Sequence, residues 1–120
     1  MANSETSLQA RLWKTLSQSP DVRLWRNNVG TCKAADGRFV RFGLCPGSSD
    51  LIGLTRVTIT PDMVGQTIAL FTAIEVKTPT GRVTPEQQSF IDFVQRSGGR
   101  AGVARSMQDA NKIISGEGHV

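Results

Sequence analysis

Three residues in this sequence carry the side chains needed to hydrolyse a phosphodiester with a divalent metal. Asp50 follows a Cys-Pro-Gly-Ser-Ser turn, and Glu75 and Lys77 stand two residues apart at the end of an apolar stretch. Carboxylates are the hard oxygen ligands that Mg²⁺ prefers, and one or two of them suffice to hold the ion. Lysine beside them could reach an attacking water or a phosphate oxygen. The pattern predicts a metal site, to which the carbonyl of Val76 could add a further oxygen ligand.

Each of these residues must be positioned by a strand. The apolar stretch 68–77 predicts a core strand, in which Glu75 and Lys77 share one face with Phe71 while Ile74 points the other way. A shorter apolar run over 51–54 starts directly after Asp50. If these two strands are neighbours, the two carboxylates meet beside the amine.

The rest of the chain alternates helical and extended patterns. Leucines every four residues predict an amphipathic helix over 5–18. Glu5 lies on its apolar stripe, either as a first-turn carboxylate that complements the helix dipole or as a functional acid. Strands are expected over 22–29, ending at Gly30, and over 38–44, with Asp36-Gly37 as a hairpin turn between them. A loop is expected over 55–66, a further strand over 101–104, and helices after Thr84 and after Ser106. This order predicts one α/β domain over 1–120, with a central mixed β-sheet flanked by α-helices.

Gln87 allows two interpretations. Thr84 as N-cap, Pro85 at the first helical position and Gln87 at the third form a capping box. Alternatively, Gln87 faces the substrate as a polar helper. One side chain cannot easily do both, so Gln88 could be the residue that points outward.

The charge balance favours a polyanionic partner. Net charge is +4, with ten Arg against four Lys, and guanidinium groups bind phosphate oxygens in bidentate fashion. Arg26, Arg38 and Arg41 are candidate phosphate contacts, although each could equally be a solvated strand residue. Two tryptophans could stack on bases, but core packing is the simpler role for both. These are Trp13 and Trp25. Ser48 and Ser49, at the glycine-containing turn before Asp50, complete the candidate DNA contacts.

Other site classes find little support. Cys32 and Cys45 lack the spacing of a zinc site or a redox pair, so both are expected to be reduced. His119 lies in a glycine-rich C-terminal tail and is not a catalytic candidate. With no apolar run of ~20 residues and no signal-peptide core in residues 1–9, the sequence predicts a cytoplasmic protein without a membrane segment.

Taken together, the motifs resemble a known family. They are Arg26-Asn27-Asn28-Val29-Gly30, Arg38-Phe39-Val40-Arg41-Phe42-Gly43, Gly47-Ser48-Ser49-Asp50-Leu51-Ile52-Gly53, Ile74-Glu75-Val76-Lys77 and Thr84-Pro85-Glu86-Gln87. This series resembles VRR-Nuc, the virus-type replication-repair nucleases of the PD-(D/E)xK superfamily, over residues 5 to about 105. Ser49 stands where the superfamily name places proline, a position that varies in the family.

The resemblance implies a restriction-endonuclease-like core that cleaves DNA with Mg²⁺ or Mn²⁺. It assigns the metal to Asp50 and Glu75, the catalytic lysine to Lys77, a polar helper to Gln87 and a water-mediated metal contact to Glu5. Small stand-alone members resemble Holliday-junction resolvases. The resemblance therefore implies a phage- or prophage-encoded homodimer in a bacterial host, acting on branched DNA.

Two other functions remain open from the sequence. The same site would serve a sequence-tolerant flap or nicking repair nuclease. In a non-catalytic basic nucleic-acid-binding module, Glu75 and Lys77 would be only an ion pair, worth ~0–1 kcal/mol if exposed. A substrate panel separates the first alternative, and loss of cleavage in Lys77→Ala excludes the second.

Overall fold

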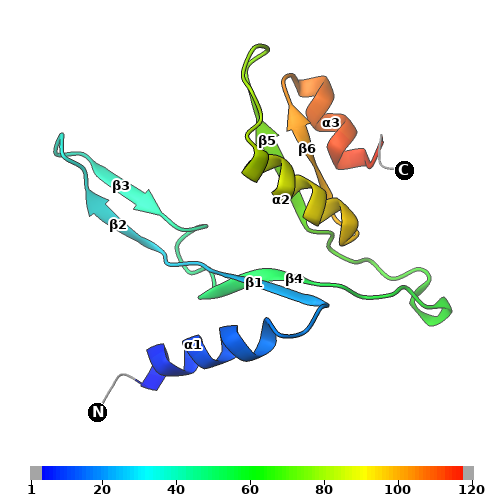
Figure 1. The fold of residues 1–120 in the computed structure, drawn as a ribbon, viewed down its shortest axis with the longest axis horizontal. Coiled ribbons are helices and arrows are strands. Elements are labelled where there is room, and N and C mark those ends of the chain that lie inside the picture. The colour runs from blue at the N-terminus through cyan, green and yellow to red at the C-terminus, as the bar shows by residue number, and fades with distance from the viewer. Residues whose placement is uncertain (1–3, 118–120) are drawn as a thin grey trace. The chain divides into compact units, whose positions relative to one another are not determined.

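A computed structural model describes residues 4–117, which form two units divided between Val57 and Thr58 (Figure 1). The first unit contains α1 Ser4–Leu16, β1 Val22–Arg26, β2 Gly30–Lys33, β3 Phe39–Phe42 and β4 Leu51–Thr55. The second unit contains the 3₁₀ helix η1 Pro61–Met63, β5 Thr72–Val76, α2 Pro85–Arg96, β6 Arg100–Ala104 and α3 Met107–Ser115. His119 lies outside the described residues.

Helix α1 is attached to β1 in the first unit. The expected amphipathic helix is confirmed, and it ends at Leu16. Trp13 links the two elements, because its indole Nε1 donates a hydrogen bond of 2.8 Å to the Leu24 carbonyl. The guanidinium carbon of Arg26 lies 5.7 Å from the centre of the Trp13 ring. Trp13 is 41% exposed, so it links α1 to β1 at the surface, and the expected role in a core is wrong.

The hairpin partner expected from the sequence is wrong. The strand expected over 22–29 ends at Arg26, and a new strand, β2, begins at Gly30 and pairs antiparallel with β3. The turn at Asp36-Gly37 is confirmed, with Gly37 at φ +88°. Gly30 suits this pairing because a Cβ there would lie 2.7 Å from Cζ of Phe42. β1 pairs antiparallel with β4 instead.

Asn27 explains why β1 ends where it does. Its backbone N–H donates to the Asp50 carbonyl at 2.8 Å, one residue beyond the Arg26–Leu51 pair. Its side chain turns toward the loop that precedes Asp50. Asn27 is thus hydrogen-bonded to the loop that precedes Asp50. The alternation of residues over 22–29 could not predict this contact.

The second unit is a parallel strand pair with helices on opposite faces. β5 and β6 pair in parallel, with Ala73 opposite Ala101. Ala101 is buried with Ile91 and Val94 of α2, and the next residue, Gly102, lies against Ile113 of α3. Because strand side chains alternate, α2 and α3 cover different faces.

The strand that carries Glu75 is shorter than the sequence predicts, since β5 begins at Thr72. Its expected alternation is confirmed: Glu75 and Phe71 are half-buried, whereas Ile74 and Val76 are exposed. The face with Glu75 is the one that packs against α2, since Phe71 contacts the buried cluster.

The α/β class and the presence of both antiparallel and parallel strands are confirmed. The described strands are hydrogen-bonded as three two-stranded sheets, β1-β4, β2-β3 and β5-β6, rather than as one continuous sheet. The strands of the first unit are short, four or five residues each, and residues 27–29 between β1 and β2 belong to neither sheet. No helix in residues 4–117 has the length and apolar character needed to cross a membrane.

Candidate active site

The second unit brings Glu75, Lys77 and Gln87 together. Oε2 of Glu75 lies 3.7 Å from Nζ of Lys77 and accepts a 3.2 Å hydrogen bond from Nε2 of Gln87. The side chains of Lys77 and Glu75 are 19% and 31% exposed, so both are partly buried and still accessible to solvent. Both of these contacts use Oε2, which leaves Oε1 of Glu75 without a protein partner among the described residues.

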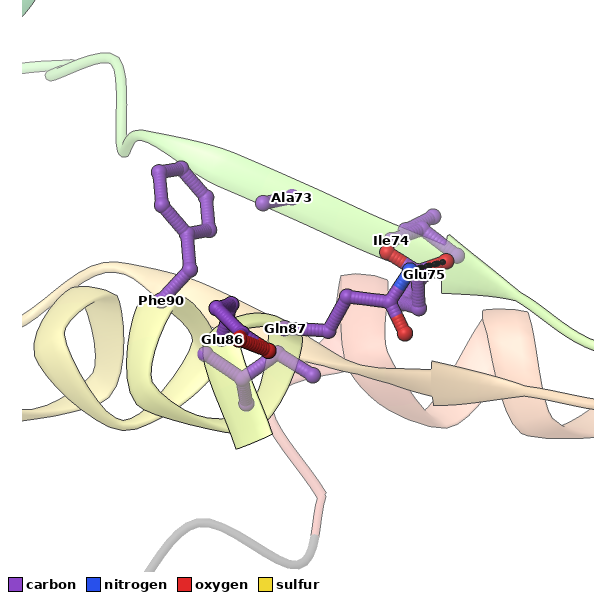
Figure 2. A pocket seen from close by; sticks show the side chains of 7 residues that line it. Ala73, Ile74, Glu75, Glu86, Gln87 and Phe90 are labelled. Atoms are coloured by element: carbon purple, nitrogen blue, oxygen red, sulfur yellow. Dashed lines mark hydrogen bonds between the residues drawn. The ribbon is translucent and has the colours of Figure 1, made fainter. Parts of the chain in front are cut away.

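Gln87 caps its helix and also contacts Glu75, and its role as a polar helper facing the substrate stays a prediction. Its Oε1 accepts from the Thr84 backbone N–H at 3.0 Å, while the Thr84 hydroxyl accepts from the Gln87 N–H at 3.1 Å. This is the expected capping box, confirmed. Because the amide oxygen caps the helix, the amide nitrogen is directed at Glu75 (Figure 2). Gln88 instead donates to Asp92 on the same helix.

We expect Gln87→Glu to separate these two roles. A carboxylate can still accept from the Thr84 N–H, as glutamate does in many capping boxes, so the helix should persist. It cannot donate to Glu75 and places a second negative charge beside it. Groups that orient metal-binding carboxylates typically contribute 10–100-fold to activity, so cleavage should fall by roughly that factor.

The matched control is Gln88→Glu, which makes the same change one position along, where the side chain contacts Asp92. Cleavage rates and melting temperatures of both variants give the comparison. Equal cleavage by Gln87→Glu and the parent would show that the contact with Glu75 is not needed. Gln87→Ala should also lose the half of the capping box in which Oε1 accepts from the Thr84 N–H, while the Thr84 hydroxyl can still accept from the backbone N–H of residue 87.

An open pocket of about 320 Å³ lies beside Glu75, between β5 and α2. Figure 2 shows Gln87 reaching from the helix toward Glu75, with the Phe90 ring turned to the strand. Because water occupies ~30 Å³ per molecule in the liquid, the pocket has room for a hydrated cation. Its lining residues include Ala73, Glu75, Glu86, Gln87, Phe90 and Ile91.

The carbonyl of Val76 points to the open edge of β5. The Phe71 carbonyl and the Lys77 N–H both bond to β6, at 2.8 and 3.0 Å. In a parallel ladder, alternate residues direct their backbone groups to opposite edges, so Val76 directs its own away from β6. No other strand of the described second unit pairs with that edge. The position fits the expected carbonyl ligand.

Arg105 holds the turn that follows Lys77, a role that the sequence analysis missed. Its Nη1 donates to the carbonyls of Thr78 and Gly81 at 2.6 and 2.7 Å, with the Pro79 carbonyl at 3.5 Å. A planar guanidinium suits such converging acceptors. Because the partners are backbone carbonyls 24 to 27 positions away, no local signal marks the residue.

In the first unit, Asn27 organises the loop that delivers Asp50. Its Nδ2 donates to the Ser48 hydroxyl at 2.7 Å and to the Ser49 carbonyl at 2.9 Å, and its Oδ1 accepts from the Leu44 N–H at 2.9 Å. With the backbone bond to the Asp50 carbonyl, both ends of the loop are fixed to one residue. In the sequence, Asn27 stands out only as part of the motif over residues 26–30, which predicts no role for its side chain.

Asp50 itself is exposed at the start of β4, and its carboxylate has no protein partner among the described residues. Glu5 is exposed in the first turn of α1. Asp50 and Glu5 thus belong to the first unit, while Glu75, Lys77 and Gln87 belong to the second. Within residues 4–117, no three or more His, Cys, Asp or Glu side chains cluster as a metal site would require.

The candidate DNA contacts all lie in the first unit, in different surroundings. Arg38 is paired with Asp36 at 2.7 Å in the hairpin turn, and its side chain is 81% exposed. Arg41 is exposed on β3, whereas Arg26 lies over Trp13. The Ser48 hydroxyl donates to the Cys45 carbonyl at 2.7 Å and accepts from Asn27, so it stabilises the turn. Ser49 is exposed.

A carboxylate and an ammonium at the end of a core strand, and an aspartate just before a strand elsewhere in an α/β chain, fit the class of metal-assisted phosphodiesterases. The comparison with protein families agrees with this class and makes it specific. The VRR-NUC domain model matches residues 3–108, so the chain belongs to the VRR-NUC family. It is a nuclease domain with a restriction-endonuclease-like fold, and its substrate is DNA. Comparisons with curated proteins and with solved structures gave no significant match.

Proposed function

We propose that this nuclease is an endonuclease that uses Mg²⁺ or Mn²⁺ to cleave branched DNA. The observation that carries the proposal is the Glu75 carboxylate, held through Oε2 by Lys77 and Gln87 with Oε1 left for a metal. Oε1 of Glu75 and the carbonyl of Val76 at the edge of β5 are hard oxygen ligands, the type that Mg²⁺ and Mn²⁺ prefer.

We further propose that the two units form one domain over 1–120, in which Asp50 supplies the second carboxylate and Glu5 a water-mediated contact. The family match supports this, since it spans both units. The Asp50 carboxylate also has no protein partner among the described residues, as expected of a ligand awaiting a cation.

The residues divide the work in cleavage as follows. A bound metal would stabilise charge on the phosphoryl oxygens and activate water. Lys77 would donate hydrogen bonds from Nζ to the attacking water or a phosphate oxygen, with its position set by Glu75. Gln87 would keep Glu75 in one orientation, and Arg105 would fix the chain beyond Lys77.

A homodimer follows from the proposed substrate. One active site cuts one strand, so symmetric incision of a four-way junction requires two sites related by a two-fold axis. Light scattering at tens of micromolar should therefore give twice the 13.0 kDa mass of the chain. A monomer mass would contradict the dimer.

The decisive experiment compares synthetic four-way junction, flap, nicked and linear DNA, each with Mg²⁺, Mn²⁺ or EDTA. We expect cleavage only with a metal, and faster cleavage of the junction than of the linear duplex. Faster cleavage of flap or nicked DNA would favour the repair nuclease instead. Cleavage in EDTA would contradict the metal mechanism, and binding without any cleavage would favour a non-catalytic module.

A further inference from the structure

The β2-β3 hairpin presents a face that combines an aromatic ring with positive charge. Phe39 lies opposite Lys33, and Arg41 lies opposite Thr31. Because side chains alternate along a strand, Phe39, Lys33 and Arg41 share one face, which we call the hairpin face. The Phe42 ring lies on the other face, over Gly30.

The side chains of the hairpin face are exposed. Phe39 is 78% exposed, compared with 45% for Phe42. Within residues 4–117, neither its ring nor the charged groups of Lys33 and Arg41 have a hydrogen bond, ion pair or ring contact. Arg38, by contrast, is paired with Asp36 in the adjacent turn. The hairpin face thus offers an apolar ring with one unpaired cation across from it, Lys33, and another two residues along its own strand, Arg41.

One of the two tryptophans that could stack on bases, Trp13, has another role. Trp13 is occupied by its hydrogen bond to the Leu24 carbonyl and by the guanidinium of Arg26. Among the aromatic side chains of residues 4–117, Phe39 has the largest exposed fraction. It is therefore the ring best placed to receive a base.

We propose that the hairpin face binds DNA at an unstacked base, with the Phe39 ring against the base and Lys33 and Arg41 on the flanking phosphates. Positive groups around an aromatic platform are the combination that binds single-stranded nucleic acid. An intact duplex offers phosphates but no free base face, whereas branch points and bulges offer both. The inference rests on the proposed function and deepens it, because it gives a physical basis for choosing branched DNA.

The test measures binding of fluorescent DNA by anisotropy in EDTA, where cleavage is not expected. The probes are a duplex with a three-nucleotide bulge, a four-way junction and a fully paired linear duplex. Phe39→Leu keeps an apolar side chain and removes the ring. We expect it to weaken binding of the bulged duplex at least about fivefold, the lower range for loss of a stacked base, and to leave the linear duplex within about twofold.

Two further variants sharpen the comparison. Phe42→Leu makes the same change on the opposite face and should preserve the difference between bulged and linear DNA. Lys33→Ala combined with Arg41→Ala should weaken binding to all three DNAs and lower the dependence of affinity on salt, because fewer counterions are released. Each variant is compared with the parent in melting temperature.

Several outcomes would overturn the inference. Equal affinities of Phe39→Leu and the parent for bulged DNA, or equal losses on bulged and linear DNA, would exclude base stacking. A change from dimer to monomer mass in Phe39→Leu would show that the hairpin face contacts a second copy of the chain. If the parent binds and cuts DNA in these cases, only the inference fails. A parent that neither binds nor cuts any DNA would contradict the proposed function as well.

Discussion

Replacing Lys77 by alanine is expected to lower the rate of DNA cleavage roughly 10³-fold, the usual effect of losing a charged donor at a developing negative charge. Nζ of Lys77 is the only ammonium in contact with Glu75 among the described residues. Single-turnover cleavage of a four-way junction with saturating Mg²⁺ measures the change without interference from product release.

The fold should survive this substitution. The Lys77–Glu75 pair spans 3.7 Å between partly exposed groups, so its loss costs ~1 kcal/mol or less. The matched control is Lys112→Ala, the same substitution at an exposed position on α3, which should cut like the parent. If Lys77→Ala cuts as fast as the parent, Lys77 has no catalytic role and the proposed mechanism is wrong.

The second large effect concerns Asp50 and Glu75 together. We expect Asp50→Asn, Glu75→Gln and the double variant to reduce cleavage to the same low level, roughly 10³-fold or more below the parent. Residues that act as one unit are strongly non-additive, because removing either one already disables the site. Two independent sites would instead give losses that multiply.

Metal-linked stability gives a second readout of the same prediction. A metal that binds only the folded protein raises its melting temperature, by an amount set by metal concentration and affinity. Mg²⁺ or Mn²⁺ should raise the melting temperature of the parent and of the control Asp21→Asn, an exposed position in the first unit. If either single variant keeps the parent's full rise, Asp50 and Glu75 do not share an ion.

Short-range features of the fold could be predicted from the sequence. Thr84 and Gln87 form the capping box of α2 as expected, and the helix expected after Ser106 begins there, with Ser106 as its N-cap. The partial burial of Glu75, on the same strand face as Phe71, follows from strand alternation. Each of these depends on residues no more than four positions apart, whose geometry is set by the local backbone.

Strand pairing and the support of the site were decided by the tertiary structure. The sequence predicted a turn at Asp36-Gly37 correctly but assigned the wrong partner strand, because a turn fixes a hairpin only over the residues that flank it. It also gave no role to Asn27, whose amide fixes the loop before Asp50, or to Arg105, whose guanidinium binds carbonyls beyond Lys77.

Gln87 shows both levels in one side chain. Its amide oxygen caps α2, a contact that the spacing from Thr84 predicts. Its amide nitrogen binds Glu75, twelve positions away on another element. The sequence determined which residue types could hold a metal and cut a phosphodiester, since that chemistry belongs to the side chains. Only the tertiary structure decided which of them support one another, because hydrogen bonds between distant segments depend on packing that no local pattern encodes.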